Sequence, residues 1–229
     1  MSQLVLPLRL ADHAVFASFL HDGNETLVAT LAGIAAGDGG QGCWLWGAVA
    51  TGKTHLLQAV CDQAGDQSVY LPLEMLAGAG PAILDGLAAR DLVCIDDVDQ
   101  VAGEKHWEVA LFNLFNELQE VGGQLIVSAG STPRECNFEL ADLASRMSRL
   151  PVFQVRLLDE QQRVAALQLR ARHRGLELPD ETAAYMLKRS RRDMASLYGL
   201  LDKLDLEALR AQRRLTIPFV RDVLQGSSD

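Results

Sequence analysis

The sequence predicts an α/β fold in which helices cover both faces of a parallel sheet, followed by a small all-helical domain. Three observations indicate this fold. Short apolar runs alternate with helical stretches up to about residue 157, as in a parallel sheet with crossover helices. Beyond that point every periodic segment is helical. The 229 residues, 48% of them hydrophobic, are enough for one core domain and a smaller second one.

Five apolar runs are expected to form the strands. They lie at residues 43–46, 68–73, 91–97, 124–129 and 152–157. The run at 91–97 is apolar until its two final acids, which is typical of a central strand in a parallel sheet.

Helices are predicted from apolar residues that recur every three or four positions. The first spans 25–36, with one face made of Leu27, Leu31 and Ile34. A weak helix is expected around 81–89. A longer one is expected at 105–120, with an apolar side made of Val109, Phe112, Phe115 and Leu118.

The second part of the chain is expected to contain four helices. They lie at residues 159–173, 180–190, 193–211 and 218–225. Pro179 and Pro218 stand near two of the predicted starts, where proline is favoured. The predicted domains are therefore 11–157 and 158–229.

Composition and charge disfavour several classes of protein. The net charge of −9 and the pI of about 5.0 disfavour duplex DNA as the main partner. No stretch reaches 18 apolar residues, so no membrane span is predicted, and residues 1–10 lack the basic start of a signal peptide. The four cysteines form no C-x-x-C pair, which disfavours a zinc cluster and favours reducing cytosol. Among them, Cys43 and Cys94 are interpreted as small core residues.

A glycine loop carries the first functional motif. GAVATGKT at 47–54 matches G-x-x-x-x-G-K-[ST] and lies between a predicted strand and a predicted helix. In such a loop, backbone N–H groups and the helix N-terminus bind phosphate. Lys53 would contact the β- and γ-phosphates of ATP or ADP, and Thr54 would hold Mg²⁺. The alternative is a plain glycine turn.

Two acids supply the second half of this site. Asp96 and Asp97 end the strand-like run LVCIDD, and carboxylates at the carboxyl end of a parallel strand face the ligand crevice. Asp96 would hold the metal, and Asp97 would orient or polarise an attacking water. Alone, such an acid pair is equally typical of a strand that runs into a solvated turn.

These motifs resemble the AAA+ superfamily of P-loop NTPases, within it the DnaA-like proteins, and in particular the Hda family. The resembling segments are FASFLHDGNETL (16–27), GKTHLLQAV (52–60), CIDDVDQVAGEKHWEVALFNLFNEL (94–118), LPDETAAYMLKRSRRDM (178–194) and LTIPFVRDVL (215–224). The resemblance implies an AAA+ nucleotide-binding domain at 11–157 and a helical lid at 158–229. It also implies a set of nucleotide contacts, namely Gly47, Ala48, Ala50, Thr51, Gly52, Lys53, Thr54, His55, Phe19 and Arg192.

Two arginines gain roles from the resemblance. Arg146 in ADLASRMSRL falls on the arginine finger, which in the family reaches the nucleotide of a neighbouring subunit, so Arg146 and Asp97 are the implied catalytic residues. Arg192 falls on the sensor 2 position of the lid, which contacts nucleotide in cis. Without the resemblance, Arg146 could equally be a solvated arginine on a helix surface. Likewise, Arg192 could belong to a cationic helix face or a nucleic-acid-binding patch with Lys188, Arg189 and Arg191.

Two positions depart from the family pattern. Ala50 stands where AAA+ proteins usually have glycine, and its methyl group would disturb the loop if the backbone needs a positive φ. Gly130 falls near the usually polar sensor 1 position, where Ser128 or Ser131 would be a weak substitute. We therefore expect weak hydrolysis by the chain itself and firmer nucleotide binding.

The first ten residues have two interpretations. QLVLPL at 3–8 resembles the peptide by which bacterial proteins dock in the DNA sliding clamp, with Gln3 in a polar subsite and Leu4, Leu6 and Leu8 in an apolar groove. The alternation of the leucines is equally compatible with an edge strand. The resemblance favours a clamp-binding peptide at 1–10.

The function implied by the resemblance is that of a bacterial, cytoplasmic regulatory adaptor. It would bind ADP or ATP, dock beside ATP-loaded DnaA and, with the sliding clamp, stimulate hydrolysis of the DnaA-bound ATP, which represses re-initiation of replication. A homodimer is plausible. Sequence-specific DNA binding is not expected, because no helix-turn-helix module follows the lid before Asp229. The alternatives are a self-sufficient P-loop ATPase or nucleotide kinase, and a replication initiation or loading factor.

Overall fold

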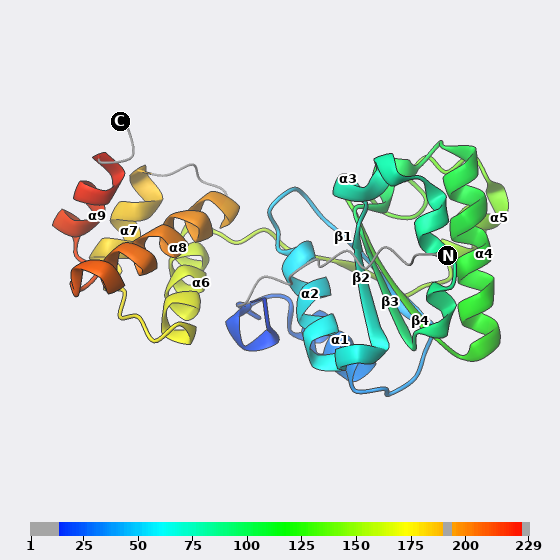
Figure 1. Ribbon diagram of the computed structural model, residues 1–229, viewed down its shortest axis with the longest axis horizontal. Coiled ribbons are helices and arrows are strands. Elements are labelled where there is room, and N and C mark those ends of the chain that lie inside the picture. Colours follow the sequence, from blue (N-terminus) through cyan, green and yellow to red (C-terminus); the bar gives the residue numbers. More distant parts are fainter. Residues whose placement is uncertain (1–13, 190–193, 226–229) are drawn as a thin grey trace.

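A computed structural model describes residues 14–189 and 194–225 of the chain. The proposed clamp-binding residues Gln3, Leu4, Leu6 and Leu8 lie outside the described residues, as does Arg192. Figure 1 shows a core built around a sheet and, beside it, a separate group of helices.

The core contains one sheet of five parallel strands in the order β2-β3-β4-β1-β5. The strands are β1 (Gly42–Trp46), β2 (Ser68–Pro72), β3 (Leu92–Asp96), β4 (Gln124–Ala129) and β5 (Val152–Gln154). All five predicted strands are therefore confirmed, although the last ends three residues before the predicted end at 157. The parallel order brings the carboxyl ends of β1, β4 and β3 together at one edge of the sheet.

Alternate strand residues separate the core into two layers. Cys43 and Leu45 of β1 face α1 (Glu25–Ala35) and α2 (Lys53–Ala64). Trp44, between them, faces α4 (Lys105–Val121) and α5 (Ala141–Met147) on the other side of the sheet. Cys43 and Cys94 are fully buried, which confirms their interpretation as core residues.

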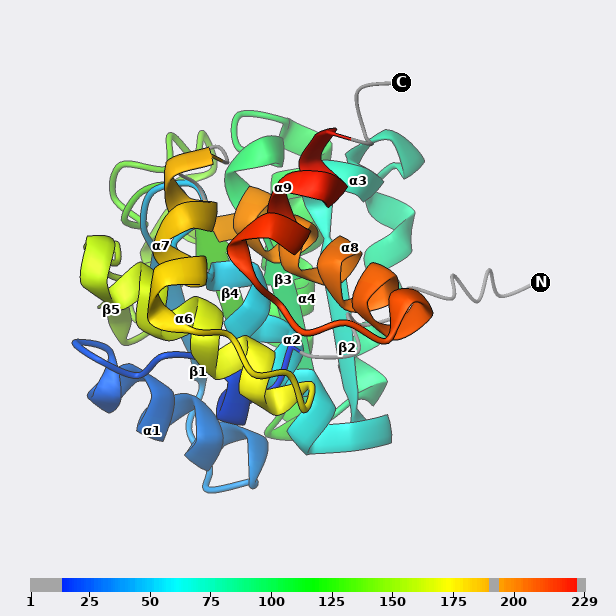
Figure 2. The same cartoon turned by 90° about the vertical axis from the view of Figure 1, so that its left-hand side faces the viewer.

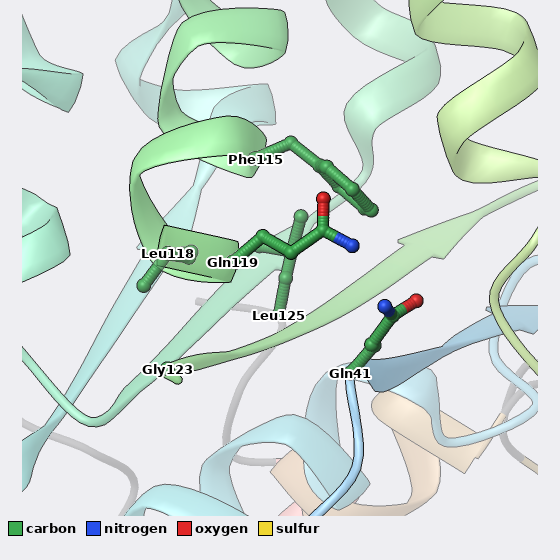
Figure 3. Close-up of a pocket in the computed structure, with 6 residues that line it drawn as sticks. All are labelled: Gln41, Phe115, Leu118, Gln119, Gly123 and Leu125. Atoms are coloured by element: carbon green, nitrogen blue, oxygen red, sulfur yellow. The ribbon is translucent and has the colours of Figure 1, made fainter. Parts of the chain in front are cut away.

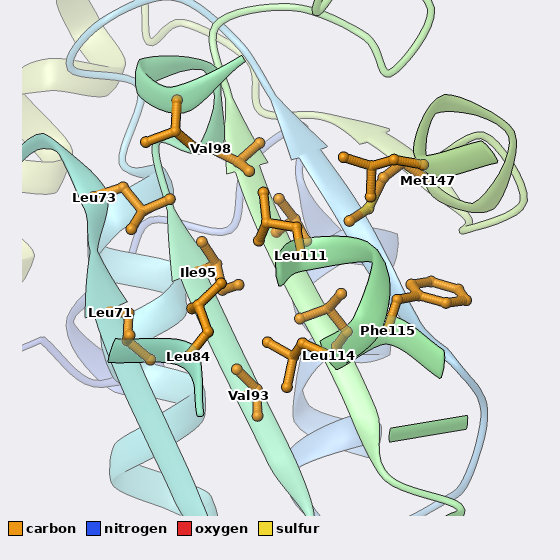
Figure 4. Packing of buried hydrophobic residues seen from close by; sticks show 14 of the residues in the cluster. Leu71, Leu73, Leu84, Val93, Ile95, Val98, Leu111, Leu114, Phe115 and Met147 are labelled. Carbon is orange, nitrogen blue, oxygen red and sulfur yellow. The ribbon is translucent and has the colours of Figure 1, made fainter. Parts of the chain in front are cut away.

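The long helix α4 forms where it is expected, but its buried face differs from the prediction. Val109 is 41% exposed, and Phe112 is only partly buried. The apolar residues that face the sheet are Trp107, Leu111, Leu114, Phe115 and Leu118. Figure 4 shows Leu111, Leu114 and Phe115 among them. This set follows the i, i+4, i+7, i+8, i+11 spacing of one helix face, and Val109 lies on the opposite side.

The weak helix expected at 81–89 is not an α-helix. The chain instead forms two 3₁₀ turns, η4 (Pro81–Leu84) and η5 (Leu87–Ala89). Gly86 between them has a φ of 76°, and Asp85 is extended, so the helical hydrogen bonds cannot continue. A short helix that the sequence did not indicate, α3 (Leu73–Leu76), follows β2 directly.

The helical region after the sheet has an apolar core of its own. Its helices are α6 (Glu160–His173), α7 (Asp180–Arg189), α8 (Met194–Ala211) and α9 (Ile217–Gln225), close to the predicted spans. Figure 2 looks onto these helices, with α2 and the sheet behind them. Leu20 packs against this core, and Gln162 donates a hydrogen bond of 2.8 Å to Asp22, so the N-terminal segment joins the two regions. Over the described residues, none of the helices has the length and apolar character needed to cross a membrane.

Candidate functional site

The loop between β1 and α2 has the backbone of a phosphate-binding loop. Gly52, which precedes α2, has a φ of 101°, and a Cβ on Gly47 would lie 2.7 Å from the carbonyl oxygen of Val155. Both positions therefore require glycine. The first turn of α2 directs free N–H groups and the positive end of the helix dipole towards the loop.

Ala50 adopts a positive φ, the conformation in which its methyl group is unfavourable. Its φ is 64°, in the left-handed region that disfavours a residue with a Cβ. The loop therefore keeps its shape at a cost that glycine would not have.

The lysine of the loop lies inside it. Lys53 is only 8% exposed, and its Nζ donates hydrogen bonds to the carbonyl oxygens of Gly47 at 2.9 Å and Ala48 at 3.3 Å. Thr54, next along α2, is exposed at the surface of the helix start. A buried ammonium beside a loop of backbone amides is suited to bind a phosphate anion.

The first acid after β3 is buried in a polar cluster at the same edge of the sheet. Asp96 is 1% exposed, and the hydroxyl of Tyr70 donates a hydrogen bond of 2.8 Å to its Oδ2. The hydroxyl of Ser128 donates to Oδ1 of Asp96 and accepts a bond of 3.0 Å from the backbone N–H of Asp97. Three neighbouring strands, β2, β3 and β4, thus meet at one carboxylate.

The second acid, Asp97, has an altered pKa and an unusual backbone. Burial, followed by the negative charge of Asp96, raises the pKa of Asp97 to about 6, although the nearby Lys53 ammonium acts in the opposite direction. Its φ of 55° turns the chain away from β3 into η6 (Val98–Val101). At neutral pH this carboxyl is therefore mostly ionised and titrates in the mildly acidic range.

The sensor 1 region contributes a backbone contact instead of a polar side chain. The N–H of Gly130 donates to Oδ2 of Asp99 at 3.1 Å. Of the two serines considered as substitutes, Ser128 is fully buried against Asp96, and the carbonyl oxygen of Ser131 accepts from the indole of Trp44 at 2.9 Å. The Ser128 hydroxyl is therefore already engaged with the acid.

The N-terminal segment packs on the glycine loop and on the start of α2. The Phe19 ring lies close to Gly52, because a Cβ on Gly52 would be 2.8 Å from that ring. The centroids of the Phe19 and His55 rings are 5.5 Å apart. Burial lowers the pKa of His55 to about 4, so the ring is neutral at pH 7. Its Nε2–H then donates to the carbonyl oxygen of Val15 at 2.9 Å. Phe19 and His55 thus lie next to each other beside the loop.

Arg146 lies apart from all of these residues. It is on α5, where its Nη1 donates to Oε1 of Gln119 at 3.4 Å and its guanidinium lies 6.0 Å from the centre of the Phe112 ring. Both partners belong to α4, which covers the face of the sheet opposite α2. Figure 1 shows α5 beyond α4, on the far side of the sheet from α2. The site at the strand ends therefore does not include Arg146 of the same chain.

A small hollow lies beside this arginine and away from the phosphate loop. Its lining residues come from the end of α4 and the starts of β1 and β4, namely Gln41, Phe115, Leu118, Gln119, Gly123 and Leu125 (Figure 3). It is therefore at the amino ends of the strands, whereas the P-loop is at their carboxyl ends.

Sequence reasoning missed two residues of this arrangement, Tyr70 and Glu108. Tyr70 of β2 is paired with Cys94 of β3, and Cys94 lies two residues before Asp96 on the same face of the sheet. The contact between Tyr70 and Asp96 therefore depends on the register of the two strands. Glu108 is a fully buried carboxylate within an otherwise apolar helix face. A charged residue at a core position of α4 was the only signal for it.

The fold and the site together define the class of the protein. A five-stranded parallel sheet with a P-loop after β1, acids after β3 and a helical region that follows the sheet is that of an AAA+ P-loop nucleotide-binding protein. Residues 82–151 match the family model for the bacterial DnaA ATPase domain, and residues 159–224 match that for the lid domain of Hda. Two adjoining segments of this AAA+ fold are therefore similar to the DnaA ATPase domain and to the lid domain of Hda.

Solved structures support the same fold. Domain III of the replication initiation protein DnaA from Thermotoga maritima is 22% identical, with a TM-score of 0.78, over 94% of this chain and 97% of that one. AMPPCP-bound DnaA from Aquifex aeolicus is 22% identical, with a TM-score of 0.70, over 88% of this chain and 68% of that one. The Thermotoga maritima RuvB branch migration motor is 17% identical, with a TM-score of 0.64, over 90% and 69%.

Proposed function

We propose that the chain is a nucleotide-bound regulatory adaptor. With the DNA sliding clamp, it stimulates hydrolysis of ATP held by DnaA and so represses re-initiation of chromosomal replication. The observation that carries this proposal is the position of Arg146, which packs on α4, across the sheet from the helix α2 that follows the P-loop of its own chain. An arginine in that place is available to the nucleotide of a neighbouring subunit, and DnaA is the neighbour that the DnaA-like core and the Hda lid favour.

The nucleotide of the chain itself is ADP or ATP, bound at the P-loop. The Lys53 ammonium lies against the backbone of the loop, and the DnaA from Aquifex aeolicus is bound to the ATP analogue AMPPCP. The proposed contacts in the described part of the chain are Gly47, Ala48, Ala50, Thr51, Gly52, Lys53, Thr54, His55 and Phe19. Lys53 would exchange its two carbonyl acceptors for phosphate oxygens, which are the stronger partners.

Magnesium would be held jointly by the protein and the phosphates. Mg²⁺ usually takes one or two protein oxygens and completes its shell with phosphate and water. Within residues 14–189 and 194–225, no three His, Cys, Asp or Glu side chains are grouped to hold a metal by themselves. We therefore assign Thr54 and Asp96 as the two protein groups, with the phosphates as the remaining anchor. The ion would neutralise phosphate charge.

Slow hydrolysis by the chain itself fits the same geometry. Asp97 is the proposed group that orients water, but Ala50 is held at a disfavoured φ of 64° and Gly130 has no side chain to polarise the γ-phosphate. The Ser128 hydroxyl, which would be the substitute, is bonded to Asp96. These features favour a chain that binds nucleotide and acts on the nucleotide of DnaA.

The clamp is proposed from the sequence alone, because residues 3–8 lie outside the described residues. The peptide would place the adaptor on clamp that is loaded on DNA, which raises the local concentration of Arg146 near DnaA.

One assay tests the proposal as a whole. DnaA is preloaded with ATP, and a single turnover of hydrolysis is followed with the full-length chain, with DNA-loaded clamp, with both and with neither. We expect rapid hydrolysis only when both are present, and little ATP hydrolysis by the chain and clamp without DnaA. Fast turnover by the chain alone, unchanged by DnaA, would instead establish the self-sufficient ATPase.

A second arm addresses the peptide. The double variant Leu6→Ala, Leu8→Ala should lose clamp binding in a pull-down and should lose stimulation, whereas Val5→Ala, which changes a residue outside the Gln3, Leu4, Leu6, Leu8 set, should retain both. Equal clamp binding by the double variant would contradict the peptide assignment.

A further inference from the structure

Glu108 is a buried carboxylate that the nucleotide site does not use. It lies on α4 with 0% of its surface exposed. Its Oε1 accepts hydrogen bonds from the backbone N–H of Gly103 at 2.7 Å and of Glu139 at 3.0 Å, and its Oε2 accepts from the N–H of Leu140 at 2.6 Å. A buried charge is tolerated only with such partners, and bonds from N–H groups to a carboxylate are strong.

These three bonds join two loops that are far apart in sequence. Gly103 ends the loop that leaves the acid pair through η6. Glu139 and Leu140 immediately precede α5, the helix that carries Arg146. One carboxylate therefore connects the acid side of the nucleotide site to the start of the arginine-bearing helix.

The helix α5 depends on such an external partner. It is seven residues long, and its N-cap residue Leu140 provides no side-chain hydrogen bond. A helix this short is not stable by itself, so tertiary contacts decide its position. Leu143 and Met147 bury the inner face of α5 in the core, and Glu108 fixes the backbone at its start.

The same helix face that carries the anchor also contacts the arginine. Phe112, one turn after Glu108 on α4, lies under the Arg146 guanidinium, and Gln119 accepts its hydrogen bond. The anchor at Leu140 and these two contacts hold α5 against α4 at both ends. Loss of the anchor would let the start of α5 move and carry Arg146 with it.

We propose that Glu108 is a positioning residue for Arg146. It holds the first residue before α5 so that the guanidinium is offered to the nucleotide of the partner in one orientation. This inference rests on the proposed function, because it concerns the stimulation of ATP hydrolysis on DnaA.

The first test is the variant Glu108→Gln. The amide keeps the size of the side chain but replaces one acceptor oxygen by an N–H₂ donor, so at least one of the three N–H groups loses its acceptor. We expect the maximal rate of DnaA-bound ATP hydrolysis to fall at least tenfold, with an unchanged concentration of the chain for half-maximal stimulation. Glu120→Gln, an exposed glutamate on the same helix, is the matched control and should leave both values unchanged.

A purely structural role is separated by two further measurements on the same samples. Binding of a fluorescent ADP to the P-loop of the chain should be unchanged by Glu108→Gln. The double variant Glu108→Gln, Arg146→Ala should be no slower than Arg146→Ala alone, because a residue that acts through Arg146 has nothing left to position. Full stimulation by Glu108→Gln would overturn the inference, as would joint loss of stimulation and nucleotide binding, or additive losses in the double variant.

Failure of the proposed function and failure of the proposed role of Glu108 give different results. If the proposed function is wrong, Arg146→Ala has no effect on DnaA in the wild-type background. If only the inference is wrong, Arg146→Ala abolishes stimulation and Glu108→Gln does not.

Discussion

The hydroxyl of Tyr70 lies 2.8 Å from Oδ2 of Asp96 and donates a hydrogen bond to it. Burial and the charge of Asp96 raise the pKa of Tyr70 well above its usual value, so the phenol stays protonated and remains a donor. With Ser128 on the other oxygen, both oxygens of Asp96 accept from hydroxyl groups of the protein. A water on a bound Mg²⁺ would have to compete with Tyr70 for the same oxygen.

Removal of this hydroxyl is expected to strengthen magnesium binding. For Tyr70→Phe, we expect the Mg²⁺ concentration for half-maximal nucleotide binding to fall several-fold, because Asp96 becomes free to accept from metal-bound water. The free energy of unfolding without nucleotide should fall by about 1–3 kcal/mol, because a buried acceptor loses its partner. Titration of Mg²⁺ against fluorescent ATP measures the first effect and urea unfolding the second. Tyr185→Phe, in the lid, is the control, and an unchanged or weaker Mg²⁺ dependence in Tyr70→Phe would contradict the competition.

The strained residue of the P-loop gives a second prediction. Ala50→Gly removes the Cβ from a residue with a φ of 64°, so we expect the free energy of unfolding to rise by roughly 1 kcal/mol. Nucleotide affinity should rise or stay equal, because the loop keeps its shape at lower cost. Ala48→Gly, whose φ is not positive, should instead destabilise the loop slightly by adding freedom to the unfolded chain. Equal unfolding midpoints for the two variants would show that Ala50 is not strained.

Asp97 predicts a dependence of stability on pH. Its pKa in the folded chain is about 6, against 3.8 for an unperturbed group, so the folded state binds this proton more tightly than the unfolded state. The stability that Asp97 contributes when protonated is therefore lost as pH rises from about 4 to about 6. The free energy of unfolding of Asp97→Asn should exceed that of wild type by about 1–2 kcal/mol at pH 7.5, after allowance for solvent screening of a half-exposed group. Near pH 3.5 the two should be equal. Urea unfolding at both pH values measures this difference, with the exposed variant Asp85→Asn as control. A difference of the same size at both pH values would contradict the raised pKa of Asp97.

His55 predicts the opposite sign in an overlapping range. Its pKa is lowered from 6.5 to about 4 by burial, so the folded state excludes a proton that the unfolded state binds. Its contribution to stability is complete above pH 6.5 and is lost as pH falls towards 4. His55→Gln, whose amide can still donate to Val15, should flatten the decline of stability over this range, whereas exposed His106→Gln should not. The measurement is the free energy of unfolding at pH 7 and pH 5. Parallel declines in wild type and His55→Gln would refute the prediction that His55 causes part of the decline.

The fold could be predicted because its signals are local. Apolar runs of strand length, separated by amphipathic helices, specify a parallel sheet without knowledge of which strands are neighbours. The same locality explains the error on α4, where Val109 was assigned to the apolar side although its direction depends on which face meets the sheet. It also explains the 81–89 segment, where Gly86 and the neighbouring extended residue interrupt a pattern that is helical in composition only.

The candidate site was predictable in its motifs and not in its contacts. GAVATGKT and the acids after β3 were found because each motif is contiguous. Tyr70 and Ser128 were not placed against Asp96, because that contact arises from the order and register of β2, β3 and β4. Glu108 meets Leu140 across 32 residues, a distance at which a single sequence has no signal.

Under the proposed function, Arg146 completes the hydrolytic site of DnaA in trans. The most direct measurement is the single-turnover rate of hydrolysis of ATP preloaded on DnaA, with DNA-loaded clamp and saturating wild type, Arg146→Ala or the neighbouring exposed variant Arg149→Ala. We expect Arg146→Ala to lose stimulation on the order of 10³-fold or more, while it still binds nucleotide and clamp, and Arg149→Ala to stimulate like wild type. Stimulation by Arg146→Ala equal to that by wild type would contradict this role of Arg146.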